Sequence, residues 1–268
     1  MQIIQLTVQD LSMAALLVLL LAGLSFVMRL QLERQIILSA IRTTIQLLLI
    51  GLVLKSLFAG SNLFWISLMA FVMLAVAGRE VMQRQKRPFS GWWGYGLGTL
   101  SMFVSSFATA IFALLVVIGT QPWYLPQYSI PLLGMMLGNT MNGVALALDR
   151  LTSSAWQQRA VIETRLSLGQ EWSEAIRDIS RDSLRTGMLP IINAMAAAGI
   201  VSLPGMMTGQ ILSGAPPLEA VKYQILIMFM IASGTGFATV IATWLGARRL
   251  FDARQRLSLY RLSNSGVK

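Results

Sequence analysis

Long runs of apolar residues dominate this sequence, and short stretches between them carry most of the charges. Each run approaches the roughly 20 residues that an α-helix needs to cross a bilayer. The pattern predicts seven membrane-spanning helices, which cover Leu11–Met28, Ile41–Ala59, Leu63–Gly78, Gly94–Ile118, Ile130–Leu148, Met188–Ile211 and Tyr223–Gly246. The expected fold class is therefore an all-α polytopic membrane protein.

The distribution of basic residues predicts the orientation of these helices. With the amino terminus outside and Arg42 counted as inside, every Lys and Arg except Lys55 and Lys222 falls on the inner face. Membrane proteins concentrate basic residues on that face. We expect an outer amino terminus, an inner carboxyl terminus, and one transmembrane domain over 1–268 with an inner loop at 149–187.

Composition supports a membrane protein and removes several classes of function. Hydrophobic residues make up 55% of the chain and charged residues 12%, and the mean hydropathy is +0.66. The chain has no Cys and no His, so it lacks a thiolate nucleophile and the usual general base of enzymes. The net charge of +10 is spread between the apolar runs, which argues against a nucleic-acid-binding domain. No acidic residue lies deep in a predicted span, which argues against proton-driven transport.

The fifth predicted span contains polar side chains in its middle. Asn139, Thr140 and Asn142 place amide and hydroxyl groups inside an apolar helix. Asn139 and Asn142 share a face because they are three residues apart. They either hydrogen-bond across a helix interface or line a water-filled path.

The sixth predicted span is interrupted by Pro204 and Gly205, so a continuous helix is doubtful there. A broken helix at membrane depth frees backbone carbonyls for a transported species, although proline kinks without a function also occur. Methionine pairs lie beside both polar features, at Met135–Met136 and Met206–Met207. Their thioethers could bind a soft ion such as Cu(I) or serve as flexible packing.

The inner loop contains an amphipathic pattern. Its apolar positions recur at helical spacing, and they are Trp172, Ala175, Ile176 and Ile179. Gly169 separates this stretch from an earlier helical run that includes Glu163 and Arg165. Two interpretations remain open, which are a docking element for a cytosolic protein and a helix lying on lipid headgroups.

Two sets of residues resemble ABC-type permeases. Glu163, Gly169 and Ile179 have the spacing of the inner-loop motif of these proteins, although Thr164 and Arg165 replace the two expected alanines. The stretches IPLLGMMLGN, LSLG, RDSLR and VSLPGMMTGQILSGAPPLEAVKYQI, all within 130–225, resemble the FetB-like family of ABC permeases. That family is linked with iron export and has plant relatives linked to aluminium tolerance. The first half matches it mainly in layout, including an interfacial helix before the second span.

The resemblance implies a transport subunit that is not itself an enzyme. No GxxxxGK[ST] motif occurs, so this chain would bind no cofactor, and ATP and magnesium would bind to a separate cytosolic, FetA-like ATPase. The working unit would be a permease homodimer with two ATPases in a bacterial inner membrane. Residues coupled to the ATPase would be Glu163, Arg165, Gly169, Trp172, Ala175, Ile176 and Ile179.

Several hypotheses about the function of this protein remain open. An ABC permease exporting iron or another metal ion is favoured, with Asn139, Asn142, Pro204, Gly205, Met206 and Met207 as candidates for the translocation path. The alternatives are an ABC permease for a non-metal substrate, a passive channel or carrier, and a membrane scaffold. Iron itself comes from the resemblance alone, because iron sites usually use imidazole and carboxylate ligands.

Overall fold

The computed structural model describes residues 7–60, 62–119 and 121–263. The chain divides into two compact units. The first comprises Met1–Asn62 with Leu212–Gly214, and the second comprises Leu63–Ile211 with Ala215–Lys268. The single domain expected over 1–268 stays a prediction.

The first unit is a helical hairpin of α1 (Val8–Val27) and α2 (Glu33–Ala59). Thr7 and Asp10 form a reciprocal capping box that satisfies the first N–H groups of α1. In the turn, the Ser25 hydroxyl accepts from the Leu32 N–H at 3.3 Å and donates to the Glu33 carboxylate at 3.4 Å. The interfacial helix expected before the second span is not separate, because α2 begins at Glu33 and no Gly or Pro interrupts it before Ile41.

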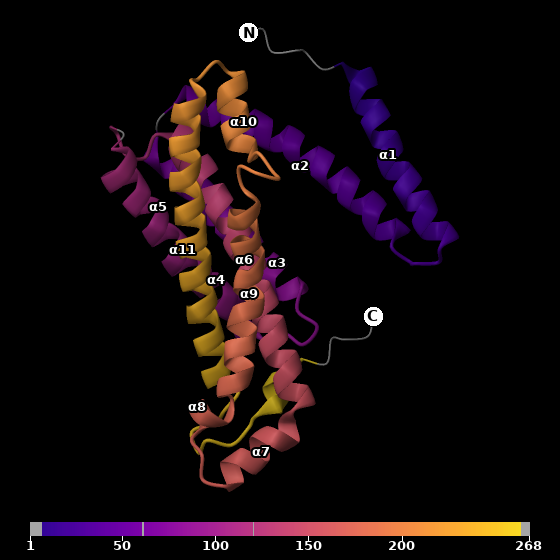
Figure 1. The fold of residues 1–268 in the computed structure, drawn as a ribbon, viewed down its shortest axis with the longest axis vertical. Coiled ribbons are helices and arrows are strands. Elements are labelled where there is room, and N and C mark those ends of the chain that lie inside the picture. The colour runs from indigo at the N-terminus through magenta and orange to yellow at the C-terminus, as the bar shows by residue number, and fades with distance from the viewer. Residues whose placement is uncertain (1–6, 61, 120, 264–268) are drawn as a thin grey trace. The chain divides into compact units, whose positions relative to one another are not determined.

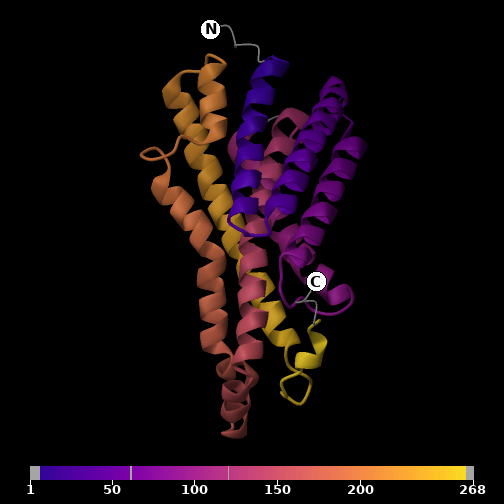
Figure 2. The same ribbon diagram turned by 90° about the vertical axis from the view of Figure 1, so that its right-hand side faces the viewer.

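The second unit contains the remaining helices, whose arrangement is shown in Figures 1 and 2. They are α3 (Leu63–Gln83), α4 (Trp92–Met102), the π-helix η1 (Phe103–Phe107), α5 (Ala108–Phe112), the π-helix η2 (Ala113–Ile118), α6 (Pro126–Gln157), α7 (Arg159–Ser167), α8 (Trp172–Ala175), α9 (Arg177–Ala197), α10 (Gly205–Leu212), α11 (Pro217–Arg249) and the 3₁₀-helix η3 (Leu259–Arg261). No strand occurs among the described residues. The all-α membrane fold predicted from the apolar runs is confirmed.

The centre of the second unit is the crossing of α6, α9 and α11, which run along one another in Figure 1. A methyl group added at Gly187 of α9 would lie 2.6 Å from the carbonyl oxygen of Gly143 on α6. It would also lie 2.8 Å from the Cγ2 of Thr239 on α11. Small residues let helix backbones approach this closely, and van der Waals contact then holds the helices together in lipid.

The helix over 92–118 is widened by its two π-helical stretches. A π-turn adds a residue to the helical turn and so redirects side chains. In η1, the Ser105 hydroxyl donates to the Gly234 carbonyl of α11 at 2.5 Å. The neighbouring Ser106 hydroxyl donates to Thr140 of α6 at 3.3 Å. Two buried serines on consecutive positions thereby join two different helices.

The sixth predicted span is not one continuous helix but parts of two helices, α9 and α10. The helix α9 begins in the predicted inner loop, continues through Pro190 and ends at Ala197, and α10 begins only at Gly205. Between them Gly199 adopts a positive φ of 83°, which ends helical geometry. The break is the one that Pro204 and Gly205 predicted. Among the described residues, six helices are long and apolar enough to cross a membrane, and α9 is not one of them because its first half is charged.

Candidate functional site

One end of the second unit is formed by a sharp corner between α7 and α8, which we call the α7–α8 corner and define as residues 159–176 (Figure 1). Gly169 has a φ of 88°, and its N–H donates to the Leu166 carbonyl at 3.0 Å. The next N–H, of Gln170, donates to the Arg165 carbonyl at 3.2 Å. These two bonds are the Schellman pattern that ends a helix at a left-handed glycine. The predicted role of Gly169 as a break is therefore seen directly.

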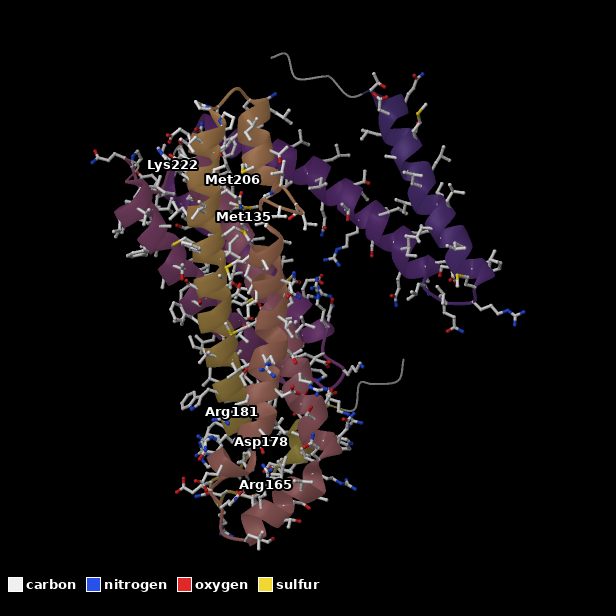
Figure 3. The ribbon with its side chains drawn as sticks, viewed as in Figure 1. Met135, Arg165, Asp178, Arg181, Met206 and Lys222 are labelled. Carbon is white, nitrogen blue, oxygen red and sulfur yellow. The ribbon has the colours of Figure 1, made fainter. Side chains whose placement is uncertain are left out.

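Arg165 holds the two sides of the corner together. Its guanidinium donates to the Ala175 carbonyl at 3.2 Å and pairs with the Asp178 carboxylate at 2.8 Å. Arg165 comes from α7 and Asp178 from the first turn of α9, and both lie at this end of the unit in Figure 3. The contact of Arg165 with a partner stays a prediction, and within the chain its guanidinium links α7 to α8 and α9.

The apolar stripe of the inner loop points into the protein. Ala175, Ile176 and Ile179 are buried, and Trp172 is half-buried with its ring 5.9 Å from that of Phe251. The stripe thus positions α8 and does not provide the apolar face that a helix lying on lipid would need. The outward surface of the corner consists of other exposed side chains, which include Glu163, Leu168, Glu171 and Glu174.

The stripe is covered by residues 250–263, which we call the carboxyl-terminal segment. Leu250 and Phe251 are buried, and the Gln255 side-chain oxygen accepts from the backbone N–H of Trp172 at 3.1 Å. Arg248, two residues before the segment, lies over the Trp172 ring at 5.3 Å. α8 is therefore held from the far end of the described chain.

The same segment also contacts the loop between α3 and α4. Leu262 is buried and pairs with Phe89, and the Ser263 N–H donates to the Pro88 carbonyl at 2.8 Å. Sequence reasoning missed this role and treated the segment as an inner tail. The alternation of Leu257, basic residues and Leu262 was the available signal, although it does not say what these leucines contact.

A turn inside the segment is organised by Asp252. Its carboxylate accepts from the backbone N–H groups of Arg256 at 2.8 Å and Arg254 at 2.9 Å, and from the Arg256 guanidinium at 3.0 Å. Hydrogen bonds to a carboxylate favour its charged form. The backbone N–H of Arg256, above all, therefore lowers the pKa of Asp252 below its ordinary value.

The polar residues of α6 separate into two roles. Thr140 is buried and bonded to Ser106, so it serves the helix interface. Asn139 and Asn142 are exposed within this unit, where Asn139 donates to its own helix at Met135 and Asn142 accepts from the Arg84 guanidinium at 2.5 Å.

These amides lie far from both ends of α6. The helix has 32 residues, about 48 Å at 1.5 Å per residue, and begins beside the aromatic residues Trp123, Tyr124 and Tyr128. A bilayer core of about 30 Å that starts there places Asn139 about 20 Å and Asn142 about 24 Å from that boundary, in the half of the core nearer the α7–α8 corner. We call the exposed side of α6 that holds them the polar face.

The break between α9 and α10 satisfies part of its own backbone. The carbonyls of Ala197, Ser202 and Pro204 all accept from nearby N–H groups at 2.9–3.4 Å. The release of carbonyls expected near Pro204 is thus offset in part. Met207 is buried, and Met206 is half-buried in the wall of a cavity with Met135.

The usual charged and imidazole metal ligands do not gather in the part of the chain that the structure describes. No group of three or more His, Cys, Asp or Glu residues is placed to hold an ion. The candidate path residues do not form one cluster either. Asn139 and Asn142 lie along the middle of α6, whereas Met206 lies in the cavity wall beyond the helix break.

Comparison with known proteins identifies relatives over nearly the whole chain. Residues 8–251 match the family described as "Uncharacterised protein family (UPF0014)". A UPF0014 membrane protein of Synechocystis is 39% identical over 234 residues, which are 85% of this chain and 87% of the relative. The "Probable iron export permease protein FetB" of Escherichia coli is 32% identical over 262 residues, or 96% of each chain. "Protein ALUMINUM SENSITIVE 3" of Arabidopsis thaliana is 33% identical over 252 residues, or 94% of this chain and 90% of the relative. No solved structure matches the chain.

Proposed function

We propose that this chain, which belongs to the UPF0014 family of membrane proteins, is the permease subunit of an ABC transporter that exports iron or another metal ion. The similarity to a protein named as an iron export permease, which extends over 96% of both chains, supports this substrate class. The observation that carries the proposal is the α7–α8 corner. It is a compact projection, fixed on its inner side and exposed on its outer side, at the end of the unit richest in charge (Figure 3).

The corner suits a contact with a motor protein for mechanical reasons. Its inner side is fastened by Arg165 and by the carboxyl-terminal segment, so a force on the corner is transmitted to α9 and α11. Glu163 and Gly169 then lie on the exposed side that would meet the ATPase, while Trp172, Ala175, Ile176 and Ile179 keep α8 in place. The chain has no phosphate-binding loop, so ATP and magnesium belong to that ATPase.

The polar face of α6 supports a homodimer. Asn139 and Asn142 are exposed within the second unit in the inner half of the expected membrane core, and polar side chains inside the core normally face protein or a water-filled cavity. A second copy across a two-fold axis would cover this face and enclose a path between the two subunits. The basic residues at the corner end favour an inner location for that end, in a bacterial plasma membrane.

Copurification from native membranes tests the ATPase coupling. The tagged chain should bring an untagged nucleotide-binding protein whose ATP hydrolysis rises when iron or another metal ion is added. A chain that comes alone would move the function to a passive carrier or a scaffold. An ATPase that is indifferent to every metal ion would retain the permease and remove the metal.

A double substitution tests the path. Asn139→Leu with Asn142→Leu should abolish metal efflux from cells while the ATPase complex still assembles, because the polar lining is lost but the helix is kept. Gln9→Leu, an exposed amide at the start of α1, is the matched control and should leave efflux unchanged. Normal efflux by the double variant would exclude this face as the path.

A further inference from the structure

A partly open cavity lies at the end of the second unit opposite the α7–α8 corner. It has a volume of about 160 Å³ and is bounded by the first turns of α6, by α10 and by the start of α11. Met135 of α6 and Met206 of α10 both line it, and Figure 3 shows them close together at this end. The helix break between Ala197 and Gly205 is what brings α10 over the start of α6.

The donor atoms of the cavity are mostly soft and uncharged. Besides the two thioethers, the wall includes the side chains of Gln127, Tyr128, Gln210 and Tyr223. The Gln210 side-chain oxygen is buried and has no hydrogen-bond donor among the described residues. A buried acceptor without a donor costs free energy, which a bound cation would recover.

No carboxylate lines the cavity, so a doubly charged hard ion would lack both its preferred ligands and a counter-charge. Lys222, labelled in Figure 3, is on the exposed start of α11, and its ammonium group pairs with the Glu219 carboxylate at 2.8 Å. Thioether ligands select soft ions such as Cu(I), and a single positive charge is the least costly to enclose between apolar walls.

We propose that this cavity is a binding site for a soft monovalent metal ion of the Cu(I) class, with Met135, Met206 and the Gln210 side-chain oxygen as ligands. The site goes beyond the proposed export function, since it requires neither the ATPase nor a particular exported ion. Met135 and Met206 line the same cavity as Gln210, whose side-chain oxygen is buried and unpartnered among the described residues.

Silver binding tests the site without redox chemistry. The purified full-length chain is dialysed against Ag(I) in the presence of excess free methionine, which strips ions from exposed thioethers such as Met13, and bound silver is measured by mass spectrometry. The wild type should retain about one ion per chain. Met135→Leu with Met206→Leu keeps the side-chain volume but removes both thioethers, and it should weaken silver binding at least tenfold. Loss of a residue that only hydrogen-bonds to a metal ligand already weakens metal binding by about that factor.

Two further measurements make the test decisive. Met73→Leu with Met141→Leu, at half-buried positions that do not line this cavity, removes the same number of thioethers and should bind silver like the wild type. Gln210→Leu should weaken binding as well. The proposal is overturned if the wild type retains no silver, if both double variants lose it equally, or if Mn(II) displaces it. Because no ATPase is present, failure of the export function would leave this result untouched.

Discussion

Replacement of Gly187 by alanine should loosen the crossing of α6, α9 and α11. The added methyl group would lie 2.6 Å from the Gly143 carbonyl oxygen, and ordinary contact begins near 3.4 Å. It would also lie 2.8 Å from the Cβ of Ala147 and from the Cγ2 of Thr239. The nearest atom belongs to the backbone, so rotation of one side chain cannot make room for the methyl group. The helix α9 must therefore shift as a whole.

The magnitude follows from a matched variant. Gly236→Ala on α11 places its methyl group 3.5 Å from the end of the Met188 side chain, which is ordinary contact. Both variants gain the same helix propensity, about 0.5–1 kcal/mol, so their difference isolates the overpacking cost, about 1–3 kcal/mol. At roughly 2–4 °C per kcal/mol, Gly187→Ala should melt about 2–12 °C below Gly236→Ala.

The assay is the fraction of detergent-solubilised protein that stays monodisperse after heating, measured by size-exclusion chromatography. Thr239→Ser in the Gly187→Ala background removes one of the close carbon atoms but not the Gly143 carbonyl, so it should restore only a small part of the loss. Equal melting temperatures for Gly187→Ala and Gly236→Ala would refute the close approach of the two backbones.

Three other predictions concern the end of the second unit that holds the α7–α8 corner. Gly169→Asp forces a side chain into a φ of 88°, so ATP hydrolysis by the copurified ATPase should become insensitive to substrate while the amount of chain in the membrane is unchanged. Phe251→Ala empties a buried site and should cost about 3–5 kcal/mol in thermal unfolding, against less than about 0.5 kcal/mol for the exposed Tyr260→Ala. The lowered pKa of Asp252 predicts that its turn is fully stabilised above the ordinary value of 3.8 and loses this contribution as pH falls through the lower folded value. As pH falls below 3.8, the rate of cleavage within 250–263 by an acid protease should therefore rise in the wild type. In Asp252→Asn, which has no carboxylate to protonate, this rise should be absent.

Features set by local chemistry could be predicted from the sequence. Apolar runs of sufficient length gave the long helices, Gly169 gave the end of α7, and Pro204 with Gly205 gave the helix break. Each depends on neighbouring residues alone, because hydropathy, a left-handed turn and a missing N–H act within a few positions.

Close helix packing was less accessible to the sequence. The pair Gly94 and Gly98 lies against the Phe89 carbonyl and the Val81 side chain, as a small-residue motif suggests. By contrast, no other atom of the described chain lies near an added methyl group at Gly205 or Gly209, although their spacing is the same. The motif specifies a possible contact, but the partner helix comes from the tertiary fold.

Long-range contacts of the candidate site were the hardest to foresee. The spacing of the apolar stripe was correct, but its partner is Phe251, far along the chain, so the stripe supports the α7–α8 corner from within. Arg165 was singled out for its place in a motif, and its pairing with Asp178 depends on the angle between α7 and α9. Such angles follow from packing that a linear pattern does not encode.

The contact between α8 and the carboxyl-terminal segment affects the order in which the protein can mature. During synthesis, α7 and α8 leave the ribosome well before Phe251, Gln255 and Leu262 do. A nascent chain that ends before residue 250 therefore presents the α7–α8 corner without the residues that cover its apolar side. The corner acquires its final form only after α11 has been made and inserted. Any cytosolic protein that recognises this form must bind after translation of the chain has passed Leu262, so recruitment also reports that the helices before it are in place.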